Sequence, residues 1–244
     1  MNISLVAEQL GSFFGFPITN SLIVAWGAMA VLVVFSLAAT RNIQMVPTGV
    51  QNVFESVVDG LLGVFENVFG NRKTAEQFFP LVATIFFFVL FVNWAEVLPG
   101  VGSIGIYEIH EGKQLLVPLL RSTSADLNFT LALAIISVLM VQIVGVGSIG
   151  FVKYIGKFLN FSSPLNFFVG LLELVSEVAK LISFSFRLFG NIFAGEVLLT
   201  VMYVLVPYFV PLPFLAMELF VGLIQAFVFA LLTVVFTKMA MTEH

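Results

Sequence analysis

The chain has 244 residues, of which 60% are hydrophobic and only 10% are charged, and its mean hydropathy is +1.10. A soluble domain carries about 25% charged residues, so this composition indicates an integral membrane protein. The formal net charge of -4 and the 10 basic residues argue against a nucleic-acid partner. With no cysteine and two histidines, the chain offers no thiol chemistry and no pattern typical of a metal site, and we expect no cofactor.

The N-terminal part of the chain predicts one membrane span and one helix that lies along the membrane. Segment 1–20 has no basic stretch and contains Glu8, which is not typical of a signal peptide, and we expect it on the outer side. Residues 21–39 are the first predicted span. In residues 48–70, apolar side chains recur at helical spacing and acidic ones lie off that stripe, which predicts an amphipathic interfacial helix.

The middle of the chain predicts two further spans joined by a polar loop. Residues 78–98 form the second span, and Glu96, beside Trp94, is expected at the membrane interface. The outer loop covers residues 99–126. The third span covers residues 127–150.

The C-terminal part predicts a long helical hairpin. Residues 164–206 are one apolar stretch of about 60 Å as a helix, which is twice the hydrocarbon thickness of a bilayer. This helix must therefore be strongly tilted or broken, and the last helix covers residues 212–240. The predicted fold is an all-α integral membrane protein with five membrane helices and one interfacial helix, in a single membrane domain.

The basic residues predict the orientation of the chain. Six of them fall on the side that we assign to the cytoplasm, and two fall on the other side. The six are Arg41, Arg72, Lys73, Lys153, Lys157 and Lys238, and the two are Lys113 and Arg121. We therefore expect the N-terminus outside and the C-terminus inside.

A polar stripe runs along the long apolar helix. At 100° per residue, five polar residues fall on one face and Ser183 borders that face; the five are Glu173, Glu177, Lys180, Arg187 and Asn191. Since the other faces are apolar, the stripe must face protein or water inside the membrane. Glu196 is nine positions after Arg187 and points to the opposite side, so we do not expect the two to form an ion pair.

The last helix carries a second polar face, because Glu218 and Gln225 are seven residues apart. An ionisable residue at the centre of a membrane helix costs about 2.5–3.5 kcal/mol, so a functional role is expected. The alternative is that these groups have only a structural role, in which they pair with one another and stabilise the helix bundle. Asp126 has two interpretations: an acid that favours the dipole of the next helix, or a group in a proton access path.

Three segments together resemble subunit a of the membrane sector of F-type ATP synthases. They are "SFSFRLFGNIFAGEVLL" (183–199), "ELFVGLIQAFVFALLTVVF" (218–236) and "STSADLNFTLALA" (122–134). The interfacial helix after the first span also fits, and the resemblance covers nearly the whole chain. The family moves ions past a rotating ring of c subunits that bear mid-membrane carboxyl groups.

The resemblance implies a role for each polar residue. Arg187 would be the essential arginine that faces the ring, with Asn191 and Gln225 as polar neighbours. The remaining residues would line two half-channels: Glu196, Glu218 and Asp126 the outer one, and Ser183, Glu173 and Glu177 the inner one. Some family members have histidine where this chain has Glu218.

The resemblance also implies partners and a location. The chain would not be an enzyme by itself, and it would work with the c ring, the b subunits of the peripheral stalk and the remaining F1Fo subunits in a lipid bilayer. We expect a bacterial plasma membrane, with a mitochondrial inner or thylakoid membrane as alternatives. The competing hypotheses are a secondary transporter or channel with Arg187 in its substrate site, and a purely structural membrane scaffold.

Overall fold

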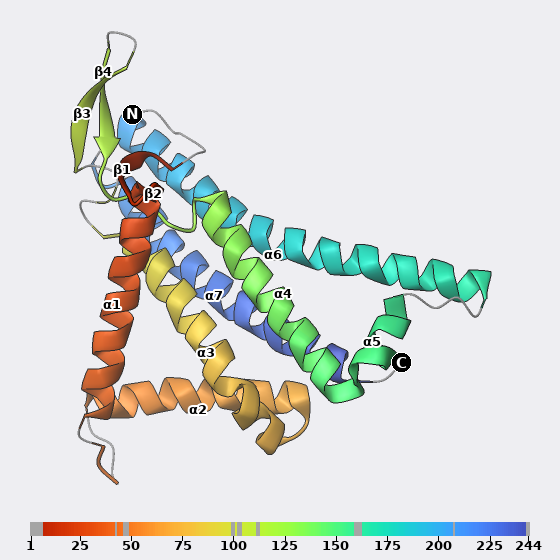
Figure 1. The fold of residues 1–244 in the computed structure, drawn as a ribbon. Helices are drawn as coiled ribbons and strands as arrows, with labels where there is room; N and C mark the ends of the chain where they lie inside the picture. Colours follow the sequence, from red (N-terminus) through yellow and green to blue (C-terminus); the bar gives the residue numbers. More distant parts are fainter. Residues whose placement is uncertain are drawn as a thin grey trace.

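The computed structural model describes residues 7–41, 43–45, 49–98, 101, 104–110, 113–158, 163–206 and 208–242. Its helices are α1 Asn20–Thr40, α2 Val50–Phe69, α3 Arg72–Ala95, α4 Leu127–Ile149, α5 Phe151–Phe158, α6 Pro164–Leu205 and α7 Pro211–Met241 (Figure 1). By length and composition, α1, α3, α4, α6 and α7 are able to cross a membrane. The structure therefore confirms the predicted all-α membrane fold with five spanning helices.

The spanning helices are arranged around α7, which packs against α3, α4 and α6. Helix α1 stands beside α3, and α2 lies across the ends of α1 and α3 (Figure 1). Buried Leu61, Leu62 and Phe65 attach α2 to the bundle, as expected for an amphipathic helix. The ammonium of Lys238, near the end of α7, donates a hydrogen bond of 2.6 Å to the carbonyl of Val68 in α2.

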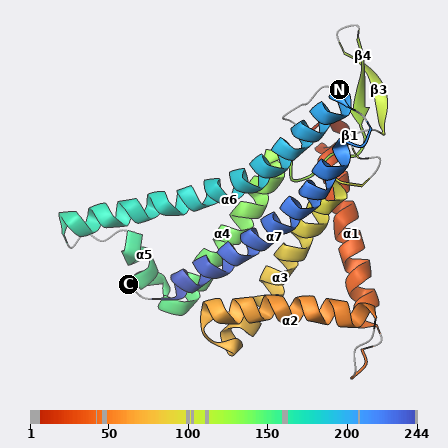
Figure 2. The same ribbon diagram turned by 180° about the vertical axis from the view of Figure 1, so that it is seen from behind.

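Helix α6 is continuous over 42 residues, so it is tilted rather than broken. At 1.5 Å per residue it is about 63 Å long, and it fits a hydrocarbon layer of about 30 Å only when strongly inclined. Helices α6 and α7 lie together at one end and diverge toward the other, where the first half of α6 projects beside α5 (Figure 2). This pair is the predicted long hairpin.

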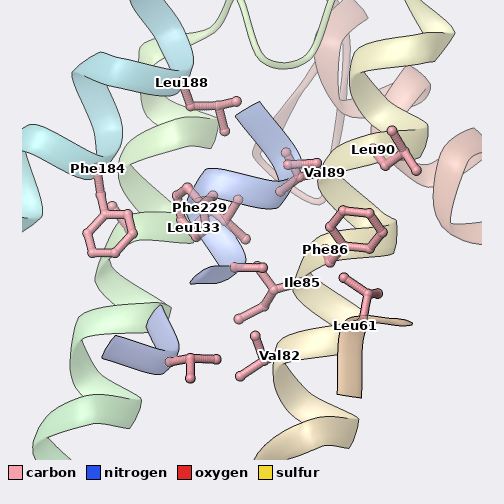
Figure 3. Close-up of a cluster of buried hydrophobic side chains, with 14 of the residues drawn as sticks. Leu61, Val82, Ile85, Phe86, Val89, Leu90, Leu133, Phe184, Leu188 and Phe229 are labelled. Atoms are coloured by element: carbon pink, nitrogen blue, oxygen red, sulfur yellow. The ribbon is translucent and has the colours of Figure 1, made fainter. Parts of the chain in front are cut away.

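The hydrophobic core fixes how α6 is rotated. Phe184 and Leu188 point into the bundle toward Leu133 of α4 and Phe229 of α7 (Figure 3). The rings of Phe184 and Phe229 are tilted, with centroids 4.7 Å apart. Ser185, between these anchors, is also buried, whereas Phe186 is exposed and Arg187 is partly exposed. Since a helix has one face toward the core, Arg187 is left toward the open side of α6.

Three features are absent from the sequence prediction. The segment before α1 contains a hairpin of β1 Gln9–Phe13 and β2 Phe16–Thr19. The expected loop 99–126 contains a second antiparallel hairpin, β3 Gly105–His110 and β4 Lys113–Pro118. The connection between α4 and α6 contains the short helix α5.

Candidate functional site

Arg187 lies in the second half of α6 on the face turned away from the core. It is partly exposed, and its Nη2 donates a hydrogen bond of 3.2 Å to the hydroxyl of Ser183, one turn earlier. No carboxylate among the described residues forms an ion pair with it. The described part of the chain therefore holds a permanent cation in an apolar helix without supplying a carboxylate counter-charge.

The two amides predicted beside Arg187 are placed differently. Asn191 is exposed and lies one helical turn after Arg187, on the same open side of α6. Gln225 is partly buried on α7. Neither amide forms a hydrogen bond with Arg187 within the described part of the chain, so the arginine is also unpaired with respect to these neighbours.

A cavity of about 210 Å³ lies between α6 and α7. Asn191, Gly195 and Leu198 line it from α6, and Met217 and Glu218 line it from α7. The side chain of Glu218 lies against the backbone of Gly195, where an added Cβ would overlap Glu218 Oε1. The cavity thus connects the open face of α6, at Asn191, with a buried carboxyl group.

Three glutamates from three elements form an acidic group, which we define as Glu96, Glu196 and Glu218. Glu218 is only 4% exposed, and neither of its carboxyl oxygens has a hydrogen-bond partner among the described residues. Glu96 Oε1 and Glu196 Oε2 are likewise buried without such a partner there. The charges of the three side chains act on one another. Such carboxyls can take up and release protons, or hold water.

Glu96 is the functional candidate that the sequence prediction missed, because it was expected at the membrane interface. It directly follows α3, and its Oε2 accepts a hydrogen bond of 2.8 Å from the hydroxyl of Ser122. Its acidic neighbours come from positions 100 or more residues later in the chain. The only signal near Glu96 in the sequence is its place at the end of a span.

The segment 121–126 is buried, although it was predicted as part of the polar outer loop. Its Ser124 hydroxyl donates a hydrogen bond of 2.6 Å to Asn93 Oδ1, and the Asn93 amide donates one of 3.0 Å to the Gly222 carbonyl of α7. Arg121 is only 5% exposed, and its charge acts on Glu96 and Glu196. This segment therefore holds α3 and α7 together and brings a cation close to the acidic group.

Asp126 caps the start of α4. Its Oδ1 accepts a hydrogen bond of 2.9 Å from the backbone N–H of Asn128, and its Oδ2 accepts one of 2.8 Å from the hydroxyl of Ser21. Both oxygens have partners that belong to the scaffold. Of the two interpretations given by the sequence, this geometry favours the acid at a helix start.

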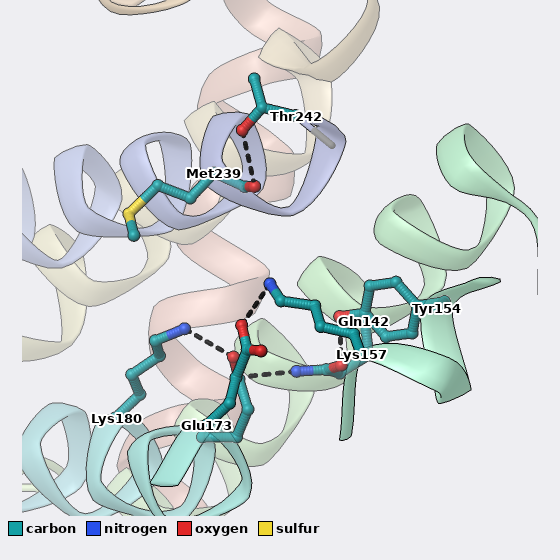
Figure 4. A network of polar contacts seen from close by, with 8 residues as sticks. Gln142, Tyr154, Lys157, Glu173, Lys180, Met239 and Thr242 are labelled. Atoms are coloured by element: carbon teal, nitrogen blue, oxygen red, sulfur yellow. Dashed lines mark hydrogen bonds and ion pairs between the residues drawn. The ribbon is translucent and has the colours of Figure 1, made fainter. Parts of the chain in front are cut away.

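Glu173 and Glu177, the acidic residues in the first half of α6, are both paired with lysines (Figure 4). Glu173 forms an ion pair with Lys157 of α5. Glu177 lies 2.6 Å from the ammonium of Lys180 and also accepts a hydrogen bond of 2.8 Å from the amide of Gln142. The acids of this half of the helix are therefore compensated, in contrast to Arg187.

Comparison with known proteins identifies the family of the chain. A family model for the ATP synthase A chain matches residues 22–238. ATP synthase subunit a of Campylobacter jejuni subsp. jejuni serotype O:23/36 (strain 81-176) is 36% identical over 209 residues, which are 84% of this chain and 83% of the relative. That of a Nitratiruptor species is 34% identical over 244 residues, or 97% of this chain and 98% of the relative. The chain belongs to the ATP synthase subunit a family.

Proposed function

We propose that Arg187 faces a rotating ring of c subunits and that two offset access paths lead protons to and from that ring. The chain is a non-catalytic Fo subunit, as its family membership implies. The observation that carries the proposal is the arginine on the open face of a 42-residue apolar helix, with no carboxylate partner among the described residues. Its counter-charge is supplied by another subunit.

Arginine suits this position because its guanidinium keeps its proton at every pH that a protein meets. A fixed cation stabilises the ionised form of a ring carboxyl, so the proton leaves toward one path as the carboxyl arrives. The same charge repels protons and so prevents direct leakage between the two paths. Each elementary charge that crosses a potential of 100 mV releases about 2.3 kcal/mol, which drives the ring.

The outer path is supported by the cavity between α6 and α7 and by the acidic group. Protons enter by way of Glu96, Glu196 and Glu218, and the cavity leads from Glu218 to Asn191 beside the ring-facing surface. Gln225 provides a further polar contact on α7. Asp126 borders this path as the residue that anchors the start of α4.

The inner path lies along the first half of α6. Ser183 is next to Arg187 and provides the first polar contact on that side. Glu173 and Glu177 follow toward the N-terminal end of the helix, each held by a lysine. The order of these groups along α6 offsets the inner path from the outer one, and the arginine lies between the two.

The partners and orientation follow from this role. The ring of c subunits pairs with Arg187, and the b subunits of the peripheral stalk hold the chain against the turning ring. The excess of basic residues assigns the C-terminal side to the cytoplasm, with a bacterial plasma membrane as the proposed location.

Proton pumping by the complete ATP synthase in inverted membrane vesicles tests the proposal. Replacement of Arg187 by Ala is expected to abolish ATP-driven pumping while the complex still assembles. Arg187→Lys is the matched control for charge, and it is also expected to fail because a lysine enclosed between α6 and the ring loses its proton more easily than an arginine. Pumping that survives in Arg187→Ala would refute the role of the arginine. Solute transport by the isolated chain would instead favour a secondary transporter.

A further inference from the structure

Lys180 is a second basic residue on the ring-facing stripe of α6. It precedes Arg187 by seven positions, so the two side chains leave the helix within about 20° of each other and about 10 Å apart along its axis. A free ammonium at this position would present a second cation to the ring. The fold has to prevent this if the ring is to meet a single attractive charge.

The structure turns Lys180 away from the open face. Its ammonium lies 2.6 Å from Glu177 Oε1 and 4.9 Å from the centre of the Phe236 ring of α7. The lysine side chain is only 19% exposed. An ion pair and a cation–π contact therefore hold the charge against the bundle.

Hydrogen bonds that involve residues of α4 and α5 hold Glu177 in place. Its Oε2 accepts a hydrogen bond from Gln142 Nε2, and Gln142 Oε1 accepts one of 2.5 Å from the hydroxyl of Tyr154. Burial raises the pKa of Tyr154 to about 12, so the phenol keeps its proton and stays a donor. Tyr154 itself is buried against Gly145, where a side chain would overlap its ring.

On the basis of the function proposed above, we infer that Glu177 neutralises Lys180 and holds its ammonium against the bundle. Arg187 is then the one cation on α6 that meets the ring. Stability alone does not explain the pair, since partly buried ion pairs are often no more stable than apolar residues of the same volume. A need to keep the charge of Lys180 away from the ring explains both the ion pair and its support by Gln142 and Tyr154. Glu177 is thus a positioning residue for ion translocation.

Loss of Glu177 has a predictable result. An uncompensated ammonium about 10 Å from Arg187, on the inner side, stabilises the ionised ring carboxyl before it can take up a proton from that side. At that distance in a partly hydrated protein, one charge changes such an equilibrium on the order of tenfold. ATP-driven pumping, which loads the ring from the inner side, is expected to slow by the same order.

The test uses the complete ATP synthase in inverted vesicles, with pumping measured per ATP hydrolysed and assembly checked by the amount of the chain in the purified complex. Glu177→Gln is expected to pump about tenfold more slowly. Lys180→Gln is expected to pump within twofold of the wild type, and the double variant Glu177→Gln/Lys180→Gln is expected to pump faster than Glu177→Gln, because it no longer carries the uncompensated ammonium. Arg72→Gln is the matched control, because it removes ion pairs to Glu66 and Glu76 outside both proposed paths and leaves Lys180 compensated.

The outcomes separate the alternatives. If Glu177→Gln pumps normally, or if the double variant is as slow as Glu177→Gln, the inference is overturned and the pair is a structural clamp. If the complex with Glu177→Gln does not assemble, pumping by the Gln142→Leu variant tests the inference instead. This variant keeps both charges and removes the hydrogen bond that supports Glu177. Slower pumping in Gln142→Leu that Lys180→Gln reverses supports the inference, and normal pumping overturns it. Pumping that persists in Arg187→Ala contradicts the proposed function itself, whereas failure of Arg187→Ala with normal Glu177→Gln contradicts only this inference.

Discussion

The carboxyl group of Glu218 in α7 rests directly on the backbone of Gly195 in α6, where an added Cβ would overlap Glu218 Oε1. This contact places a buried acid at the cavity between the two helices of the hairpin. It also brings the acid within one helical turn of Asn191 on the open side of α6. The glycine is therefore part of the proposed outer path, although it has no functional group.

Replacement of Gly195 by Ala tests this contact. The added methyl group overlaps Glu218 Oε1 and must displace the carboxyl group. Because Ala favours a helix by about 1 kcal/mol over Gly, a general loss of helix stability is not expected. We predict proton pumping on the order of tenfold slower, equivalent to about 1.4 kcal/mol in the barrier. Gly147→Ala on α4, with open space around the new methyl group, should pump normally; equal rates in both variants would contradict the prediction.

Replacement of Asn93 by Ala tests how α3, α7 and the segment 121–126 are joined. The change leaves the Ser124 hydroxyl and the Gly222 carbonyl without their partner. Buried polar groups without hydrogen bonds destabilise a protein, here by about 2–3 kcal/mol in the free energy of unfolding. Denaturant unfolding in detergent micelles measures this loss. Trp94→Phe removes only one exposed bond, to the Leu219 carbonyl, and should cost less than about 1 kcal/mol. A larger loss for Trp94→Phe than for Asn93→Ala would refute the prediction.

The buried phenol of Tyr154 predicts a specific response to alkaline pH. Its pKa is raised from 10.0 to about 12, mainly by burial and further by the charges of Glu177 and Glu173. A group whose pKa is higher in the folded state contributes stability that is complete below the unfolded value and is lost as the pH rises through the folded value. The thermal midpoint of the wild type should therefore fall between pH 10 and pH 12. The fall should be smaller in Tyr154→Phe, which has no proton to lose; parallel profiles would show that the phenol does not titrate as described.

The sequence predicted the architecture of α6 and α7 because length and periodicity are properties of single helices. A 42-residue apolar stretch has to be tilted, and the spacing of Arg187 and Asn191 puts both on one face. The same reasoning separated Glu196 from Arg187. The hairpin β3–β4 was not predicted, because its strands lie in a segment that shows only the polarity of a loop.

The parts of the site that escaped prediction depend on contacts between distant segments. Glu96 resembles an interfacial residue until Glu196 and Glu218, from two other helices, lie near it. On a helical wheel Glu177 and Lys180 belong to the same stripe as Arg187. Their i,i+3 spacing allows an ion pair within the helix, but the contacts that hold this pair against the bundle come from Gln142 of α4 and Phe236 of α7. The sequence of α6 alone does not contain those contacts.

Cross-linking between α6 and the ring tests most directly whether the Arg187 face meets a c subunit. The chain has no cysteine, so single cysteines can be placed without background reaction. Asn191→Cys lies one turn from Arg187 on the same face, and Met29→Cys on the exposed, apolar side of α1 is the control. With a cysteine one turn from the ring carboxyl, oxidised membranes should contain a cross-linked product for Asn191→Cys and none for Met29→Cys. No product at Asn191, or equal amounts at both positions, would contradict the account.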